Sequence, residues 1–337
     1  MPPDRQRPGL NLTGLVSAVA GLALFAWYVR RIGAQEILDD LRAVGWGFVA
    51  IVAITGVRFA LRASAWRLCL EPPHRLRFRD AFAAVLAGDA MGNLTPLGLF
   101  ASEPAKAAFV RANVPLGPSL TALAIENIAY SLSAFAMIAT STLALLFAFD
   151  LPYGFEEIAA AGVGAILILF AVVAWLLWRR PALVRRLLAR VVPASSRFST
   201  HVDRLHALEE QIYTFAVRRR EVIIPLTAAE ISFHALGVVE IYLTWWLMQG
   251  AAPPLLTAFI LEGATRLITV VFKFVPLQLG VGEMTTAEFT RMLGYGLTPG
   301  TSLAIVRKAR IVFWVVIGTG VWVRGVGRQS SIVNRQS

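Results

Sequence analysis

The sequence predicts an all-α polytopic membrane protein with about six full transmembrane helices and two re-entrant helical hairpins in an inverted repeat. Three observations lead to this fold class. Of the 337 residues, 57% are hydrophobic and only 16% are charged, compared with about 25% in soluble domains. Apolar runs recur that reach the roughly 20 residues a helix needs to cross a bilayer. One polar interruption of an apolar region also returns 180 residues later.

Six apolar segments are long enough to cross a bilayer as helices. They cover residues 10–29, 46–68, 119–147, 159–178, 222–248 and 300–323. The first segment is followed by Arg30 and Arg31 and not by a small-residue cleavage site, so we expect a retained helix and no signal peptide. Residues 34–44 place four apolar side chains on one helical face, which predicts a short helix on the membrane surface.

The repeated interruption consists of residues 96–111 and 276–291. At a constant offset of 180 residues, 7 of these 16 positions are identical, including the proline, glutamate and arginine at 96/276, 103/283 and 111/291. We therefore treat residues 1–337 as one integral membrane domain with two repeat units, about 46–148 and 222–324. The basic loop 179–221 lies between them.

Each interruption lies within an apolar region, 80–113 or 255–293, and breaks it at 93–102 or 275–282. The helix before the first break has 13 residues and reaches about 20 Å, which is less than the hydrocarbon core of about 30 Å. If these helices crossed fully, the basic loop 179–221 would lie outside, contrary to the positive-inside rule.

As re-entrant hairpins, the two regions leave every basic loop and both termini in the cytoplasm. The acidic loop 150–157 then lies outside, and the two repeat units run in opposite senses through the membrane. Secondary transporters use such inverted repeats, with broken helices meeting near the midplane at the substrate site. We accordingly expect the breaks to line a cavity, because irregular backbone at membrane depth must be buried in protein or face water.

The candidate substrate-binding residues are those of the breaks and the ionisable residues embedded in the apolar segments. They are Asn93, Pro96, Glu103, Lys106, Arg111, Pro276, Gly280, Glu283, Arg291, Arg58, Arg62 and Glu126. Two simpler roles compete with binding. Glu103 and Glu283 fall at the expected starts of half-helices, where a carboxylate offsets the helix dipole. Arg111 and Arg291 fall at the expected hairpin mouths, where a long basic side chain can reach the membrane surface.

Further embedded charges leave similar alternatives open. Glu262 and Arg266 are four residues apart and are expected to pair with each other. Arg58 and Arg62 are expected to pair with Glu126 or Glu103. A basic cluster at 307–310 near the start of the last span is interpreted either as an interfacial anchor or as a phosphate-binding group.

Composition limits the other function classes. The net charge of +11 reflects basic loops, since loop 179–221 alone has ten arginines and four acidic residues. We therefore expect no nucleic-acid partner. The single cysteine, Cys69, rules out an intrachain disulfide, and the four histidines lack metal-ligand spacing. We find no catalytic signature, and we expect no metal, no cofactor and no intrinsic enzyme activity.

The two break motifs resemble those of the lysylphosphatidylglycerol synthase transmembrane-region family, also called flippase-like domain proteins. The family shows an Asn-x-x-Pro break leading to Gly-Glu-x-x-Arg/Lys, which here reads Asn93-Leu-Thr-Pro96 and Ser102-Glu103-Pro-Ala-Lys106. Its later Pro-Gly-Gly-Leu-Gly-x-x-Glu motif reads Pro276-Leu-Gln-Leu-Gly280-Val-Gly-Glu283. This sequence departs from the family pattern at Ser102 and at Leu277-Gln278.

The resemblance implies a role in moving lipids or lipid-linked precursors between leaflets, and we expect a location in the bacterial inner (plasma) membrane. In the synthases the module precedes a soluble aminoacyl-transfer domain, and we expect no lysine transfer here because 14 residues follow Val323. The leading hypothesis is a transporter or flippase of an anionic phospholipid or lipid-linked substrate. The alternatives are a membrane-embedded lipid transferase using buried acids, and an accessory subunit of a lipid- or glycan-synthesis complex. That subunit would dock a cytoplasmic partner through loop 179–221, although attraction of this loop to anionic lipid is the simpler reading.

Overall fold

The computed structural model describes residues 34–95, 98–149, 151, 154–179, 210–211, 214–215, 218–272, 275, 278 and 280–333. These residues form helices and no sheet. The helices are α2 (Ala34–Val44), α3 (Gly47–Cys69), α4 (Phe78–Leu94), α5 (Gly98–Phe109), α6 (Leu116–Ala148), α7 (Phe155–Arg179), α10 (Arg220–Gln249), α11 (Leu255–Val271), α12 (Val281–Met292) and α13 (Thr298–Val333).

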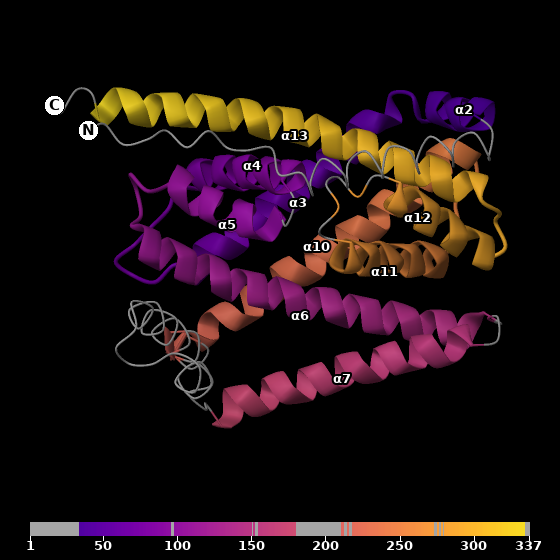
Figure 1. Cartoon of the computed structure of the whole chain (residues 1–337), viewed down its shortest axis with the longest axis horizontal. Helices are drawn as coiled ribbons and strands as arrows, with labels where there is room; N and C mark the ends of the chain where they lie inside the picture. The colour runs from indigo at the N-terminus through magenta and orange to yellow at the C-terminus, as the bar shows by residue number, and fades with distance from the viewer. Residues whose placement is uncertain are drawn as a thin grey trace, which may run out of the picture.

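Two long helices, α6 and α13, run the length of the molecule in opposite directions (Figure 1). The short pair α4 and α5 lies in one half of the molecule, and the short pair α11 and α12 lies in the other (Figure 1). α4 packs against α13, whereas α11 packs against α6. α3 and α10 pack against each other, and α7 packs along α6.

Four of the described helices are long and apolar enough to cross a membrane, which supports the all-helical membrane class. They are Gly47–Cys69, Leu116–Ala148, Phe155–Trp175 and Arg220–Gln249. These coincide with four of the six expected spans. The first expected span, 10–29, lies outside the described residues. The last, 300–323, is helical as part of α13, but it is not one of the four. The short helix expected at 34–44 is present as α2.

The two breaks are narrower or displaced relative to the sequence prediction. α4 continues to Leu94 and α5 begins at Gly98, so Asn93 and Ser102 are helical and not part of the first break. α4 and α5 pack antiparallel, since Gly88 lies against Lys106 and Ser102, and Asn113 donates a hydrogen bond to Asp80 at 3.0 Å at the open end. The second break begins three residues earlier than expected, because α11 ends at Val271.

The second break uses left-handed backbone. Gln278 has φ 51° and Gly280 has φ 78°. Gly280 immediately precedes α12, and it adopts this conformation at little energetic cost because it lacks Cβ. The chain can therefore turn sharply into α12.

The apolar core is divided into two clusters. One surrounds Trp66 of α3, Val85 of α4 and Leu123 of α6, and the other surrounds Ile51 of α3 and Ile241 of α10. Because α3 contributes to both clusters, the residues of its middle turns lie between them. Those middle turns hold Arg58 and Arg62, so the fold places a polar layer between two apolar layers. Most of the basic loop, residues 180–209, lies outside the described residues.

Candidate functional site

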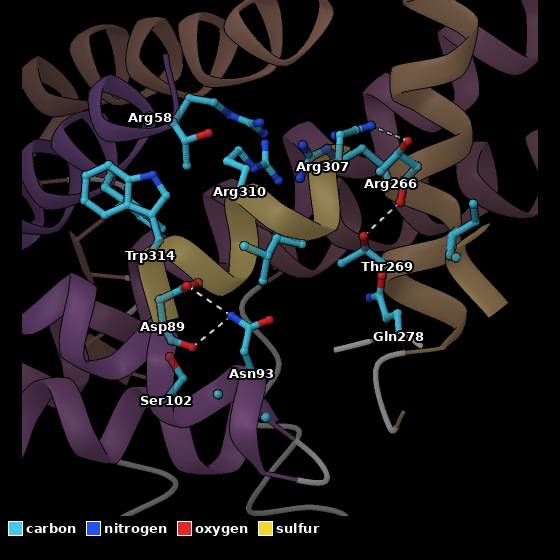
Figure 2. Close-up of a pocket in the computed structure, with 18 of the residues that line it drawn as sticks. Arg58, Asp89, Asn93, Ser102, Arg266, Thr269, Gln278, Arg307, Arg310 and Trp314 are labelled. Atoms are coloured by element: carbon cyan, nitrogen blue, oxygen red, sulfur yellow. Dashed lines mark hydrogen bonds between the residues drawn. The ribbon is translucent and has the colours of Figure 1, made fainter. Parts of the chain in front are cut away.

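A cavity of about 350 Å³ lies between the two helix breaks. Residues of α3, α4, α5, α6, α10, α11, α12 and α13 line it, together with Gln278 of the second break. Figure 2 shows four arginines along one side of the cavity and Asp89, Asn93 and Ser102 on another. Seven basic side chains line it: Arg58, Arg62, Lys106, Arg266, Arg307, Lys308 and Arg310. Only three acidic side chains do so, namely Asp89, Glu103 and Glu283. The wall of this cavity is therefore suited to an anion.

Two fully buried glutamates lie behind the arginines, and the first of them is Glu240 on α10. Its Oε2 accepts a hydrogen bond from Arg58 Nη1 at 3.1 Å, and Arg310 Nη1 donates a short hydrogen bond to its Oε1. Arg307 Nε lies 3.4 Å from the same Oε1 atom. Arginine suits such a position because its planar group presents several donors at once.

The second buried glutamate is Glu262 on α11. It accepts hydrogen bonds from Arg266 Nε at 2.8 Å and Arg307 Nη2 at 3.1 Å, and Arg58 Nη2 lies 3.5 Å away. Helix α10 can approach this carboxylate because residue 237 is glycine: a Cβ there would lie 2.1 Å from Glu262 Oε1. The expected pairing of Glu262 with Arg266 is thus correct, but it is part of a larger network.

The network contains more arginines than glutamates. Four arginines share the two carboxylates of Glu240 and Glu262, so this cluster of six side chains has a formal net charge of +2. The Nε atoms of Arg58 and Arg310 are buried and have no hydrogen-bond partner among the described residues. A buried donor without a partner is unfavourable, so a bound anion that accepted these bonds would be stabilised.

Aromatic rings hold three guanidinium groups in place. Arg58 Cζ lies 4.2 Å from the centre of the Phe233 ring, and Arg266 Cζ lies 5.4 Å from the same ring. Arg62 Cζ lies 4.1 Å from the centre of the Tyr130 ring, whose hydroxyl accepts a hydrogen bond from Arg266 Nη1 at 3.3 Å. These contacts fix the arginines before any ligand arrives.

Three further ion pairs border the cavity. Arg62 Nε lies 2.9 Å from Glu126 Oε1, Lys106 Nζ donates to Glu103 Oε1 at 2.7 Å, and Lys308 Nζ lies 3.5 Å from Glu283 Oε1. Arg62 thus takes one of the two partners expected for it, whereas Arg58 pairs with Glu240 and Glu262 and not with Glu126 or Glu103. Glu103 of α5 pairs with a lysine of its own helix, whereas Glu283 of α12 pairs with a lysine of α13.

Two carboxyl groups near the cavity form no ion pair with any described residue. Asp89 Oδ2 accepts a hydrogen bond from Asn93 Nδ2 at 3.0 Å, and Asn93 also bonds to the Asp89 carbonyl at 2.9 Å. Glu230 Oε2 accepts only a long hydrogen bond, 3.5 Å, from Ser133 Oγ. Ser133 Oγ also lies 3.0 Å from His234 Nε2.

Six of the predicted site residues line the cavity: Asn93, Glu103, Lys106, Glu283, Arg58 and Arg62. Glu126 is 1% exposed and lies behind Arg62, and Gly280 begins the turn into α12. Arg111 and Arg291 are exposed and do not line the cavity, and Arg291 pairs instead with Glu288 at 2.7 Å. Pro96 and Pro276 lie outside the described residues.

The capping role considered for Glu103 is wrong, because α5 begins at Gly98 and Glu103 lies beyond its first turn. Glu283 does lie in the first turn of α12. Its Oε2 has no hydrogen-bond partner among the described residues, and its Oε1 faces Lys308.

Sequence reasoning left several cavity residues out of the candidate set. Those that carry charge are Asp89, Arg266, Arg307, Lys308 and Arg310. The signal for the last three was their position within an apolar helix, which predicted either an anchor or a phosphate-binding group. Arg307 and Arg310 are buried, Lys308 is half-buried, and all three side chains line the cavity. No group of three or more His, Cys, Asp or Glu among the described residues is placed to hold a metal ion.

Comparison with known proteins gives one match. The family model described as the lysylphosphatidylglycerol synthase TM region matches residues 13–320, which is most of the chain and includes every cavity residue named above. No curated protein and no solved structure matches the chain.

Proposed function

The chain belongs to the lysylphosphatidylglycerol synthase TM-region family, an integral membrane family related to lipids, and we propose that it transports an anionic lipid between leaflets. The phosphate-bearing headgroup would occupy the central cavity while the acyl chains stay in the bilayer. The observation that carries this proposal is the four-arginine cluster in the cavity wall, with only two glutamates behind it.

The chemistry of the cluster fits a phosphate better than a neutral or cationic headgroup. Guanidinium groups match the geometry of phosphate oxygens, and arginine is favoured wherever planar recognition of phosphate matters. The two buried donors without partners, Arg58 Nε and Arg310 Nε, offer hydrogen bonds that a phosphate oxygen would accept. Inside a protein, where the local dielectric constant is lower than in water, such bonds are stronger than at a surface.

The helix arrangement supports the inverted repeat that alternating access requires. In this proposal α3, α4, α5 and α6 correspond to α10, α11, α12 and α13. The packing of α4 on α13 then matches that of α11 on α6. The ion pairs correspond as well, with the charges exchanged: Arg62 of α3 pairs with Glu126 of α6, and Glu240 of α10 pairs with Arg310 of α13.

Alternating access would then involve the two short helix pairs. We propose that α4–α5 is a re-entrant hairpin opening to the cytoplasm and that α11–α12 is its inverted counterpart opening to the outside. Outward movement of either pair would expose the cavity to one leaflet, as in transporters built from inverted repeats. The basic loop 179–221 and both termini would be cytoplasmic under the positive-inside rule.

Reconstitution into vesicles tests the proposal. Vesicles would contain fluorescent phosphatidylglycerol, phosphatidylethanolamine or phosphatidylcholine, and an impermeant reductant would bleach the outer leaflet. We expect bleaching of phosphatidylglycerol beyond the outer-leaflet half with the wild-type protein. Arg310→Gln should slow this movement, because it removes a cavity cation.

Arg291→Gln is the matched control, since Arg291 is exposed and lies outside the cavity. Elution of both variants as monodisperse protein would show that they fold. Absence of lipid movement above protein-free vesicles for all three headgroups would refute the proposal. Equal slowing of lipid movement by Arg310→Gln and Arg291→Gln would show that the effect does not depend on the cavity, and would refute its role as the headgroup site.

A further inference from the structure

Asp89 differs from the other acidic side chains in the cavity wall. Glu103 and Glu283 each face a lysine, Lys106 and Lys308, at 2.7 and 3.5 Å. Asp89 forms no ion pair with any described residue, and its Oδ2 accepts a hydrogen bond from the amide of Asn93. An anionic headgroup that entered the cavity would therefore meet one carboxyl group without a cation of its own.

The charges facing Asp89 come from each helix that packs on α4. These groups are Arg58 and Arg62 of α3, Glu103 and Lys106 of α5, and Arg307, Lys308 and Arg310 of α13. Every cation among them already contacts a glutamate within 4.0 Å. Together these cations attract an anion, but none of them forms an ion pair with Asp89.

A count of charge across the site shows why this matters. Seven cations line the cavity, and five glutamates pair with them: Glu103, Glu126, Glu240, Glu262 and Glu283. Two further carboxyl groups in or near the cavity wall, Asp89 and Glu230, form no ion pair with a described residue. With both ionised, the empty site is neutral. A monoanionic headgroup would then add one uncompensated charge to a low-dielectric interior, which is strongly unfavourable.

Resting on the transport function proposed above, we propose that Asp89 is a proton-binding site and that one proton enters with each anionic headgroup. Protonated Asp89 no longer repels the phosphate, and its hydroxyl can donate a hydrogen bond to a phosphate oxygen. Asp89 lines the cavity that the headgroup would enter, whereas Glu230 is 2% exposed and does not line the cavity. The loaded site and the empty site are then both neutral.

If one proton moves with each anionic headgroup, a pH gradient across the membrane can drive the movement of lipid. A membrane face at lower pH protonates Asp89 and loads the anion, and the opposite face releases both. Because the proton and the anion cancel, the movement should respond to a pH gradient and not to the membrane potential. The charge that crosses with the lipid is zero in this scheme.

Anion binding by purified full-length protein tests the inference without requiring transport. The probe is a water-soluble short-chain phosphatidylglycerol, which as a phosphodiester keeps one negative charge from about pH 5 to about pH 8. We expect its Kd to rise about tenfold per pH unit where Asp89 is ionised in the empty protein. Calorimetry in two buffers of different ionisation enthalpy should give one proton taken up per bound anion.

The Asp89→Asn variant tests whether Asp89 is the residue that binds the proton. The variant resembles the protonated form, so we expect it to bind the probe at every pH with no proton uptake. Asp80→Asn is the matched control, because Asp80 also accepts a 3.0 Å hydrogen bond from an asparagine, Asn113, but lies away from the cavity. It should keep the wild-type pH dependence.

The outcomes separate this inference from the proposed function. Probe binding by the wild-type protein without proton uptake or pH dependence would overturn the proton site and leave the transporter proposal intact. Loss of proton uptake in Glu230→Gln but not in Asp89→Asn would overturn the assignment to Asp89. Failure of the wild-type protein to bind the probe at any pH would instead count against the proposed function. The wild-type measurement decides the coupling even if a variant does not fold.

Discussion

Replacement of Glu262 by glutamine should destabilise the protein more than any exposed substitution. Glu262 has no solvent exposure, and it receives hydrogen bonds from Arg266 and Arg307 while Arg58 lies 3.5 Å away. Glutamine keeps one acceptor oxygen and presents an amide donor to the remaining arginines. Breaking a buried ion pair in this way costs about 3–5 kcal/mol. At about 2 °C per kcal/mol for a chain of this size, Tm should fall by roughly 6–10 °C.

The matched control is Glu288→Gln. Glu288 accepts a 2.7 Å bond from Arg291, but the two side chains are 42% and 60% exposed, so the pair should contribute at most about 1 kcal/mol. Tryptophan fluorescence of both variants would be followed on heating in the same detergent. A Tm for Glu262→Gln within about 2 °C of the control would refute the view that the buried arginines depend on this carboxylate.

Two further outcomes follow from packing. Gly318→Leu should abolish most of the monodisperse protein on size-exclusion chromatography, because a Cβ at residue 318 would lie 2.2 Å from the Leu86 carbonyl oxygen of α4. Gly320→Leu should elute like the wild type, because a Cβ at residue 320 would have no neighbouring atom within 4 Å. Equal elution of the two variants would contradict the α4–α13 contact. Cys69 is 1% exposed, so a maleimide should label the folded protein at least about tenfold more slowly than the denatured protein. Rapid labelling before denaturation would contradict the packing of α3.

The helices were predictable because each is a local feature of the sequence. Apolar length and flanking prolines place Leu116–Ala148 and Leu255–Val271 within a few residues of their observed bounds. The first break was less predictable. Ser102 and Glu103 were expected to end and begin different elements because of the polar residues around them, but α5 begins at Gly98 and continues through Pro104. Antiparallel contact with α4 at Gly88 and Gly92 stabilises this longer helix.

The sequence allowed several residues of the site to be predicted, but not how they pair. The 180-residue offset identified Glu103 and Glu283, yet the lysine that faces Glu283 is Lys308 of α13, outside the repeated stretch. The partners of Glu240 are remote in sequence in the same way, since Arg310 lies 70 residues away. No local sequence pattern predicts which of the helices with charged residues will pack against each other. Sequence reasoning therefore identified the embedded charges, but it could not join them into one cluster.

The pairing of Arg58 has a consequence for how the chain is made. Both of its acidic partners belong to the second half of the protein, and Glu240 follows it by 182 residues. At about 5–20 residues per second, a ribosome takes roughly 9–36 s to synthesise that interval. During this time α3 has a charge that costs about 2.5–3.5 kcal/mol at the centre of a bilayer. We therefore expect helix α3 to reach its final position only after α10 has been inserted beside it and has supplied this counter-charge.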